Sequence, residues 1–214
     1  VRACDIDGDG DLDLLVASMG TIFPSNDKIG AFIILENDGK MNFRKHVIAD
    51  HIARVSDVNA GDLNGDGNPE VLISANRYFR IFDGKSGTLL YEVPTHASSP
   101  YGWGDEGGFQ QQHVTVADVD GDGHAEIIVG MYDGLTIFGS QNNDWVASRK
   151  IWNQYDYHVT NVNDDGTIPQ YEAPSALLNN TFTCQALLAL TANPYLTPNL
   201  TASYLRSVQY GSAV

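Results

Sequence analysis

The chain has 214 residues, of which 43% are hydrophobic, so it is long enough for one sizeable core or a short series of repeats. Its formal net charge is -15 and its 12 Lys and Arg residues are spread along the chain, which argues against nucleic acid as a partner because clustered basic side chains bind phosphates. No apolar run reaches the roughly 18 residues of a membrane span, so we expect no membrane insertion.

An acidic loop lies at the start of the chain and recurs twice. The three copies are Asp5-Ile-Asp7-Gly-Asp9-Gly-Asp11-Leu-Asp13, Asp62-Leu-Asn64-Gly-Asp66-Gly-Asn68-Pro-Glu70 and Asp118-Val-Asp120-Gly-Asp122-Gly-His124-Ala-Glu126. Each copy has oxygen-bearing side chains at positions 1, 3, 5 and 9 and a glycine at position 6, where the backbone must turn sharply. This arrangement suits a hard cation that takes six to eight oxygen ligands. The repeat therefore predicts three calcium sites.

Three alternatives compete with this interpretation. An EF-hand needs a bidentate Glu at position 12 between two helices, whereas position 12 here is Val16, Ile73 or Val129, each within a short β-branched run. Magnesium prefers a tight octahedron that retains several waters, which fits a cage of carboxylates less well. A solvated Asp-Gly turn explains one isolated copy better than three copies in register.

A fourth and weaker copy of the loop runs from Asn161 to Pro169. Asn161, Asn163 and Asp165 occupy positions 1, 3 and 5, but Pro169 at position 9 has no side-chain oxygen. Two interpretations stay open, namely a weakened calcium site and a loop retained only for its turn.

Short strands follow each loop in the same order. The predicted strands are 14–17, 31–35 and 43–48 in the first unit, 71–75, 78–82 and 89–93 in the second, and 127–131, 135–138 and 145–147 in the third. Residues 1–4 predict a further strand before the first loop. The loops start at residues 5, 62 and 118, which is a nearly constant period and is typical of a repeat architecture. Four short strands per unit indicate a propeller blade.

Two insertions and the C-terminal segment are less regular. Residues 94–112 predict a loop that is either functional or a structural cover. Residues 149–184 are polar and aromatic, and residues 175–192 fit either a helix or a closing strand.

The loops, the strands after them and the Asn-Asp-Gly hairpin at residues 37–39 together resemble the FG-GAP/VCBS repeats of integrin-type β-propellers. The resemblance implies an all-β fold of propeller-type blades, here a partial propeller because complete ones usually have seven blades. It also implies that the loops bind calcium through side chains at positions 1, 3, 5 and 9 and a main-chain carbonyl at position 7. The implied ligands are Asp5, Asp7, Asp9, Asp11, Asp13, Asp62, Asn64, Asp66, Asn68, Glu70, Asp118, Asp120, Asp122, His124 and Glu126, with Asn161, Asn163 and Asp165 at the weaker fourth loop.

The resemblance also predicts how the chain is divided. Residues 1–170 hold three clear blades and a degenerate fourth one, and residues 171–214 form a closing or linker segment. Residues 151–169 look like the closing segment of such propellers in large bacterial surface proteins, and residues 198–205 are similar to the first strand of an immunoglobulin-like CARDB adhesion domain. A strand apart from its own domain must pair with something, so we hypothesise that this tail adds to a neighbouring subunit's sheet in a fibre.

The compartment follows from calcium and from the chain's few cysteines. Constitutive calcium loops favour an extracellular or cell-surface location, where calcium is millimolar. The chain begins without Met, which indicates a processed or partial chain. Cys4 and Cys184 form either a disulfide, worth about 4 kcal/mol on the chain-entropy model, or two buried thiols. Asn179 and Asn199 fit the N-glycosylation pattern of a glycoprotein.

The motif content argues for a structural role. No Gly-x-Ser-x-Gly, His-Glu-x-x-His or phosphate-loop motif is present, so we expect no enzyme, with a polysaccharide lyase on a calcium propeller as the catalytic alternative. A carbohydrate-binding module is the stronger alternative, although aromatic residues in such folds more often fill blade interfaces. Its candidate stacking residues are Trp103, Trp145, Trp152, Tyr155 and Tyr157.

The sequence thus predicts a secreted, calcium-stabilised structural or adhesion module of a larger surface or filament-forming protein. Its expected partners are other proteins or copies of itself, and possible ligands include carbohydrate.

Overall fold

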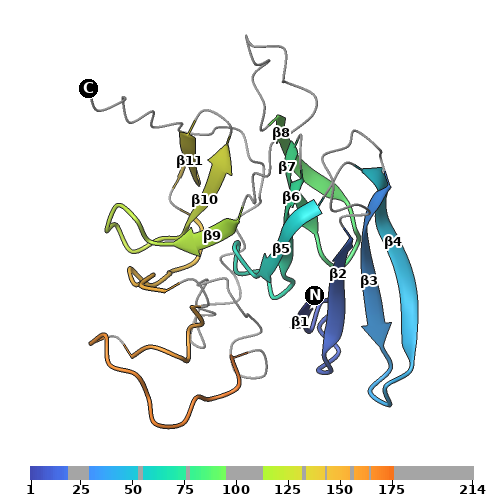
Figure 1. The fold of residues 1–214 in the computed structure, drawn as a ribbon, viewed down its shortest axis with the longest axis horizontal. Helices are drawn as coiled ribbons and strands as arrows, with labels where there is room; N and C mark the ends of the chain where they lie inside the picture. The colour runs from blue at the N-terminus through green and yellow to red at the C-terminus, as the bar shows by residue number, and fades with distance from the viewer. Residues whose placement is uncertain are drawn as a thin grey trace.

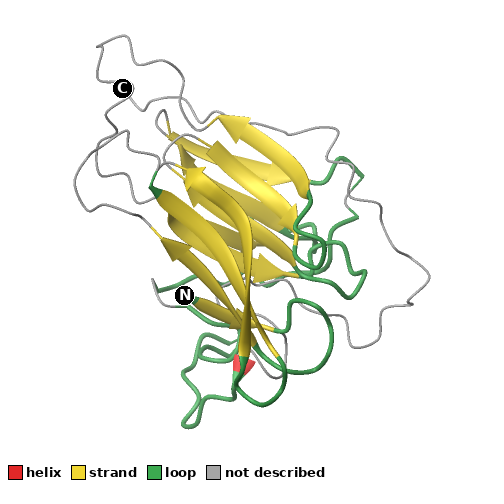
Figure 2. Cartoon of the chain, turned by 90° about the vertical axis from the view of Figure 1, so that its right-hand side faces the viewer, coloured by secondary structure: helices red, strands yellow, loops and turns green. Residues whose placement is uncertain are grey.

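The structure is a computed structural model that describes residues 1–18, 29–52, 55–75, 78–94, 113–131, 134–142, 144–154, 157–163 and 165–175. Strand and loop account for nearly all of this part of the chain (Figure 2), which ends in a helical conformation at Ser175. Within it, no helix is long and apolar enough to cross a membrane. The all-β class expected from the sequence is confirmed.

The described strands form three small antiparallel sheets (Figure 1). The first sheet, in the order β1-β2-β3-β4, contains β1 (Arg2–Cys4), β2 (Asp13–Ser18), β3 (Gly30–Asn37) and β4 (Phe43–Ile52). The second, in the order β5-β6-β7-β8, contains β5 (Val55–Gly61), β6 (Glu70–Ala75), β7 (Tyr78–Asp83) and β8 (Leu89–Pro94). The third, in the order β11-β10-β9, contains β9 (Val114–Ala117), β10 (Glu126–Met131) and β11 (Gly134–Gly139).

The second sheet lies between the other two, and both of its faces are buried. All six residues of β6 are buried. Because side chains alternate across a strand, Val71 and Ile73 join the hydrophobic cluster shared with the first sheet, whereas Leu72 joins the cluster shared with the third. Full burial of such a side chain contributes about 1.5 to 3 kcal/mol. These two clusters therefore hold the three sheets together.

Aromatic pairs cross both interfaces. The ring centroids of Phe32 and Phe82 lie 6.4 Å apart between the first and second sheets. Those of Phe79 and Phe138 lie 5.2 Å apart in a stacked arrangement between the second and third sheets. Such pairs add specific geometry to the apolar burial, so the sheets are fixed in register with one another.

A hairpin turn of the second sheet closes against the loop region of the first. The backbone N–H of Gly84, just after β7, donates to the carbonyl of Pro69 at 3.0 Å. A Cβ atom at Gly84 would lie 2.4 Å from that carbonyl oxygen and 2.5 Å from Cδ1 of Ile6. Only glycine allows this approach, and it brings the ends of the two sheets that carry the acidic loops into contact.

One predicted strand is wrong. Residues 145–147 do not form the fourth strand of the third sheet, because Trp145 is 5% exposed and packs in the core between the second and third sheets. Instead, Ala147 makes an isolated antiparallel bridge with His124 of the third loop. Among the described residues the third sheet has three strands, and the sheets do not form a closed ring. Strands β5 and β9, which precede the second and third loops, were not assigned from sequence.

Several predictions lie outside the described residues. They concern the loop at 95–112 with Trp103, then Tyr155, and the segment 176–214 with Asn179, Cys184, Asn199 and the tail at 198–205. Cys4 is a buried free thiol, which favours the free-thiol alternative over the disulfide, and burial raises its pKa above the ordinary value.

Candidate metal centres

Each acidic loop joins the first two strands of its sheet. The residue before position 1 and the residue at position 9 face each other in the antiparallel register: Cys4 with Asp13, Gly61 with Glu70 and Ala117 with Glu126. Each loop is therefore the closing turn of a two-stranded ladder, with positions 1 and 9 at its neck. The strands fix where the acidic side chains begin and end.

The same hydrogen bonds fold all three loops. The carboxylate at position 1 accepts the backbone N–H groups of positions 4 and 6, at 2.7 and 3.0 Å for Asp5, 2.7 and 2.9 Å for Asp62, and 2.6 and 3.0 Å for Asp118. The side chain at position 3 accepts the N–H of position 5, and position 5 accepts that of position 7. Bonds of this kind are typical of Asp and Asn turns. The repeated sequence thus encodes a repeated backbone path.

The glycines at positions 4 and 6 are required by that path. In all three loops their φ angles lie between 76° and 96°, a region in which a side chain would be strained. Glycine at these positions is therefore explained by the turn itself, independently of any ion.

Carboxylate oxygens converge in the first and third loops. In each, three Asp residues contribute one oxygen apiece, and these oxygens lie within 4.8 Å of one another. The two groups are Asp5, Asp7 and Asp13, and Asp118, Asp120 and Asp122. Oxygen ligands lie about 2.3 to 2.6 Å from calcium, so oxygens at these separations can share one ion. The donor set in both loops fits calcium.

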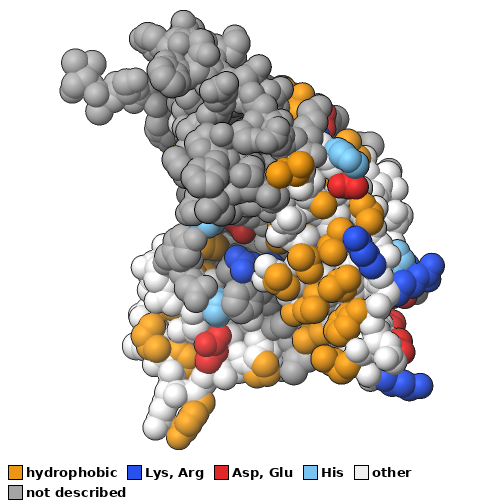
Figure 3. Space-filling view, turned by 45° about the vertical axis from the view of Figure 1, so that its right-hand side comes forward, with side chains coloured by type: hydrophobic (Ala, Val, Ile, Leu, Met, Phe, Trp, Pro, Cys, Tyr) orange, Lys and Arg blue, Asp and Glu red, His pale blue; other side chains and the backbone are white. Residues whose placement is uncertain are grey.

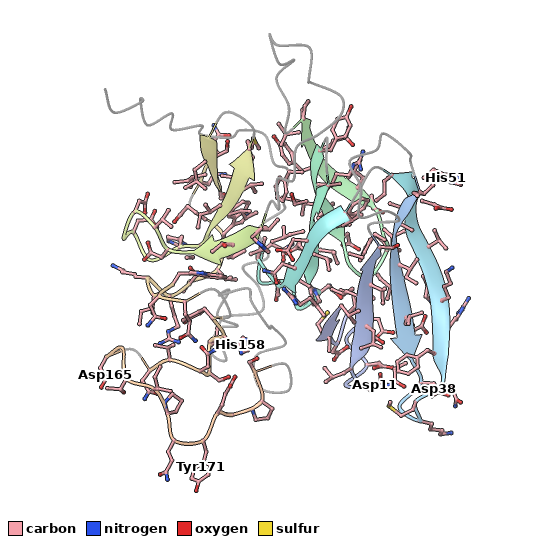
Figure 4. The ribbon with its side chains drawn as sticks, in the orientation of Figure 1. Asp11, Asp38, His51, His158, Asp165 and Tyr171 are labelled. Atoms are coloured by element: carbon pink, nitrogen blue, oxygen red, sulfur yellow. The ribbon has the colours of Figure 1, made fainter. Side chains whose placement is uncertain are left out.

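Asp11, at position 7 of the first loop, adds a further negative charge next to the converging carboxylates. Its Oδ1 is enclosed and no hydrogen bond reaches it. Burial raises its pKa above the ordinary value, and so do the neighbouring carboxylates of Asp9, Asp7, Asp5 and Asp38. Figure 4 shows Asp11 and Asp38 at the same end of the first sheet. A cation bound by the neighbouring carboxylates would relieve the like-charge repulsion.

The carboxylate at position 9 is buried in every loop. Asp13, Glu70 and Glu126 are 1%, 1% and 8% exposed, and each accepts the N–H of position 2 at 2.8 to 2.9 Å. Burial raises the pKa of Asp13 above its ordinary value, that of Glu70 to about 8 and that of Glu126 to about 7, while backbone hydrogen bonds oppose the shift. A divalent cation at the loop would favour the ionised form.

The second loop has a different interior. The side-chain amide of Asn64, at position 3, donates to Asp66 Oδ2 at 3.2 Å and to Glu70 Oε1 at 3.0 Å. Asn64 Oδ1 accepts the N–H of Asp66 at 2.8 Å, which orients the amide so that its NH₂ group faces the carboxylates. Here an amide makes contacts with the carboxylates that an ion would otherwise make. The second loop retains the path of the other two with fewer charges.

In the third loop, two basic side chains flank the acidic group. Nδ1 of His124 lies 2.7 Å from the carbonyl of Trp145, so this nitrogen contacts the neighbouring segment. The ligand implied at position 7 is the main-chain carbonyl. Nζ of Lys150 lies 3.8 Å from Asp118 Oδ2 and 3.3 Å from the carbonyl of Gly121. Its ammonium is placed to compete with a metal ion for Asp118.

Val146 ties the second loop to the third, a role that the sequence did not indicate. Its N–H donates to the carbonyl of Leu63 at 2.9 Å, and its carbonyl accepts the N–H of Ala125 at 2.9 Å. A Cβ at Gly65 would lie 3.3 Å from Cγ1 of Val146. The apolar character of Trp145 and Val146 signals burial, but only the fold shows that they join two loops.

Asn37 is a second supporting residue that the sequence did not single out. Its backbone N–H donates to Asp13 Oδ1 at 2.8 Å, and its side chain donates to the carbonyl of Leu12 at 3.2 Å. The hairpin between β3 and β4 therefore holds position 9 of the first loop. In the sequence, Asn37 stands just before Asp38-Gly39, and this pattern predicts a hairpin turn but not a contact with the first loop.

The fourth loop repeats these hydrogen bonds only in part among the residues that the structure describes: the N–H of Thr167 at position 7 donates to Asp165 at position 5, but the N–H of Gly166 at position 6 does not donate to Asn161. Asn161 Oδ1 accepts the N–H of His158 at 2.9 Å, and the N–H of Gly166 donates to the carbonyl of Asn163 at 2.8 Å. Asp165 accepts both the N–H and the hydroxyl of Thr167, which lowers its pKa. In Figure 4 Asp165 and His158 lie apart. Calcium at this loop stays a prediction.

The described aromatic candidates for sugar stacking pack against the protein. Trp145 is 5% exposed and Tyr157 is fully buried. The ring of Trp152 lies 5.3 Å from that of Tyr157, and the Arg149 guanidinium lies 5.8 Å from the same ring. Arg149 also donates to the carbonyls of Val159 and Val162 at 2.7 and 2.8 Å. The described rings of Trp145, Trp152 and Tyr157 therefore pack against other parts of the protein.

Known proteins resemble the chain in sequence over the first loops and in fold over most of its length. Residues 5–73 match the FG-GAP-like repeat, and no curated protein sequence matches the chain. The crystal structure of the biofilm matrix protein Bap1 of V. cholerae has a TM-score of 0.58 and 23% sequence identity over 83% of this chain. The chain spans 28% of that protein's length. At this identity the likeness concerns the fold.

Proposed function

We propose that the chain is a calcium-stabilised structural and adhesion module of an extracellular surface or matrix assembly. The observation that carries the proposal is the convergence of three carboxylate oxygens within 4.8 Å in both the first and the third loop. The match of residues 5–73 to the FG-GAP-like repeat supports it. The fold likeness to a protein named as a biofilm matrix protein supports the extracellular and structural part.

The ion's role in this proposal is structural. In the first loop Asp5, Asp7, Asp9 and Asp13 would hold it with the carbonyl of Asp11. In the third loop the equivalent ligands are Asp118, Asp120, Asp122 and Glu126, with the carbonyl of His124. In the second loop the equivalent residues are Asp62, Asn64, Asp66 and Glu70, with the carbonyl of Asn68, and an ion there would have to displace the Asn64 amide from Glu70. Bound calcium would neutralise the carboxylates and fix the turn between the first two strands of each sheet.

The loops' position in the fold supports a structural role for calcium. Each loop closes the ladder between the first two strands of its sheet, and the second and third loops are joined through Val146. Repulsion among unneutralised carboxylates would therefore act directly on the ends of all three sheets. Carbohydrate binding has no comparable support, because Trp145 and Tyr157 are packed inside the protein.

Thermal unfolding in calcium and in excess chelator tests the proposal. At a calcium concentration 100 times the Kd, one site stabilises the fold by about 2.7 kcal/mol. For a chain of this size that corresponds to a rise in melting temperature of about 5 to 10 °C. Magnesium at the same concentration should give a smaller rise. Equal melting temperatures in calcium and in chelator would contradict the proposal.

Matched variants assign the effect to the loops. Asp7→Asn and Asp120→Asn each remove one charge from a carboxylate group and should reduce the calcium-dependent rise. Asp50→Asn removes the same charge from the exposed strand β4, away from the loops, and should leave the rise unchanged. Isothermal titration calorimetry of the same variants counts the sites.

A further inference from the structure

The three acidic loops differ at position 3, where the first and third have Asp7 and Asp120 and the second has Asn64. In every loop the Oδ1 atom of this residue accepts the backbone N–H of position 5, at 3.2, 2.8 and 3.1 Å in chain order. The turn therefore uses one of the two terminal atoms of the side chain in all three loops. The other terminal atom is left for the interior of the loop.

That second atom is an oxygen in Asp and an NH₂ group in Asn. In the second loop it donates to Glu70 Oε1 at 3.0 Å and to Asp66 Oδ2 at 3.2 Å. Turning the amide over would place its NH₂ group against the N–H of Asp66, so that two donors face each other. The turn thus fixes the amide in the orientation that presents a donor to the carboxylates. Calcium is bound by oxygen atoms, and an N–H donor offers it no lone pair.

The carboxylates of the second loop do not converge as those of the other two loops do. In the first and third loops, three carboxylate oxygens lie within 4.8 Å of one another. Residues 62–70 all belong to the described part of the chain, yet Asp62, Asp66 and Glu70 form no such group. The amide of Asn64 lies between Asp66 and Glu70 and contacts both. A neutral donor therefore stands where the other loops bring carboxylates together.

Glu70 shows what an ion would have to displace. Its Oε1 accepts the Asn64 amide, and its Oε2 accepts the N–H of Leu63 at 2.8 Å. The residue is 1% exposed, so water cannot replace a lost partner at this place. An ion that entered the loop would separate the amide from both carboxylates and leave its NH₂ group buried without an acceptor, which is costly.

The carboxylate content of the loops follows the same division. On the face of the molecule that Figure 3 shows, acidic side chains appear singly or in small groups among hydrophobic and basic ones. The three acidic loops by contrast contain 12 of the 27 acidic residues, with five in the first, three in the second and four in the third. The second loop therefore has the least like-charge repulsion for an ion to relieve.

We infer that the second loop is closed by the Asn64 amide and holds no calcium, whereas the first and third loops each take one ion. The inference rests on the proposed function and narrows it, because it restricts the ion to two of the three loops. The central sheet then keeps its loop closed whether or not calcium is present. Calcium acts on the two outer sheets, and on the second loop only through its link to the third at Val146.

Native mass spectrometry of the full chain in calcium counts the bound ions, and a matched pair of variants at position 5 assigns them. Asp122→Asn in the third loop removes one of the converging carboxylates. It should lower the count by one or weaken one site by at least about tenfold, since affinity follows the charge of the ligands. Asp66→Asn makes the same change in the second loop and should leave both the count and the affinities unaltered.

A gain of binding gives the decisive result, because misfolding cannot produce it. Asn64→Asp replaces the amide by a carboxylate and should raise the number of bound calcium ions by one. Asn68→Asp adds the same charge to the same loop at position 7, where the implied ligand is the main-chain carbonyl, and should leave the number unchanged. Melting curves check that each variant is folded. An ion held by the fourth loop is common to all variants and cancels from these differences.

Three outcomes would overturn the inference. Loss of one ion in Asp66→Asn would show that the second loop of the unaltered chain binds calcium. An unchanged count in Asn64→Asp, or an equal gain in Asn68→Asp, would show that the amide is not what excludes the ion. The proposed function fails in a different way, with no calcium bound by any variant and equal melting temperatures in calcium and in chelator. An ion in all three loops together with calcium-dependent melting defeats only the inference.

Discussion

The first and second acidic loops have the same backbone path, but they differ in the number of carboxylates and in what those carboxylates contact. Both have the same hydrogen bonds from backbone N–H groups to positions 1, 3, 5 and 9. The first loop has five carboxylates within nine residues, and Asp11 Oδ1 remains without a hydrogen-bond partner. The second has three, and the Asn64 amide contacts two of them.

Position in the fold accounts for the difference. The second loop belongs to the central sheet, and its Asp62, Asn64 and Glu70 are 5%, 6% and 1% exposed. Burial in such a place raises the cost of each additional charge. An amide lowers that cost and keeps the loop closed without an ion. The backbone path and the charge inside the loop are thus set by different residues of one motif.

The largest effect is expected from removing the acceptor at the neck of the second loop. In Glu70→Ala, the N–H of Leu63 and the amide of Asn64 lose a buried partner, so the unfolding free energy should fall by about 2 to 4 kcal/mol. Because this network is internal, chemical denaturation should give the same loss in calcium and in chelator. A loss confined to calcium would mean that Glu70 acts through an ion.

The pH dependence of the metal-free chain should reveal the same buried carboxylate. The pKa of Glu70 is raised from 4.5 to about 8 by burial, so the folded state binds a proton more readily than the unfolded state. Its stabilising effect is complete below pH 4.5 and is lost as pH rises toward 8. In chelator, a shift of this size corresponds to a decline in stability of at most about 5 kcal/mol over this range.

Two controls sharpen the pH experiment. Glu70→Gln should flatten the decline, because the amide does not titrate. Calcium should reduce the decline contributed by Glu126, whose pKa of about 7 is raised chiefly by burial and further by Asp120, Asp122 and Asp118. A decline that is unchanged in Glu70→Gln would place the titrating group elsewhere.

Replacing Asn64 at position 3 of the second loop by the Asp found in the first loop should make the two loops more alike. Asn64→Asp puts a third charge beside Asp66 and Glu70 and removes two amide hydrogen bonds. It should lower stability in chelator by about 1 to 2 kcal/mol and recover most of that loss in calcium. Chemical denaturation in both buffers measures the difference. If calcium restores nothing, the second loop lacks the geometry for an ion.

The smallest effect is expected at the third loop. Lys150 is 65% exposed and lies 3.8 Å from Asp118, so Lys150→Gln should change stability in chelator by less than about 0.5 kcal/mol. Calorimetry should nevertheless show tighter calcium binding, since the competing ammonium is gone. Lys85→Gln, in the hairpin turn of the second sheet, serves as the charge-matched control. Unchanged affinity would show that Lys150 does not compete.

Much of the fold could be read from local pattern. The runs at 71–75 and 127–131 correspond to β6 and β10 because β-branched apolar residues bounded by turn signals form strands regardless of the rest of the chain. The same pattern predicted a strand at 145–147, and this was wrong. A Trp beside a short apolar run is equally compatible with a strand and with a side chain packed in the core. Strand β5 contains Ser56, Asp57 and Asn59. These polar residues interrupt the apolar pattern from which a strand is predicted.

The candidate sites divide in the same way. Sequence spacing identified the loop positions, because the ligands and the turn-forming glycines lie within nine residues. It did not identify Asn37, Val146 or Lys150, which reach the loops from 24 to 83 residues away along the chain. Nor did it indicate that the Asn64 amide faces Glu70, since only the folded loop orients that group.

The sequence by itself determined the repeat and the path of the three acidic loops, because those depend on residues that are close neighbours in the chain. Tertiary structure decided which loops gather carboxylates and which one closes on an amide. It also decided which sheet has both faces covered by the described residues. Those outcomes depend on burial, and burial is a property of how distant segments pack together.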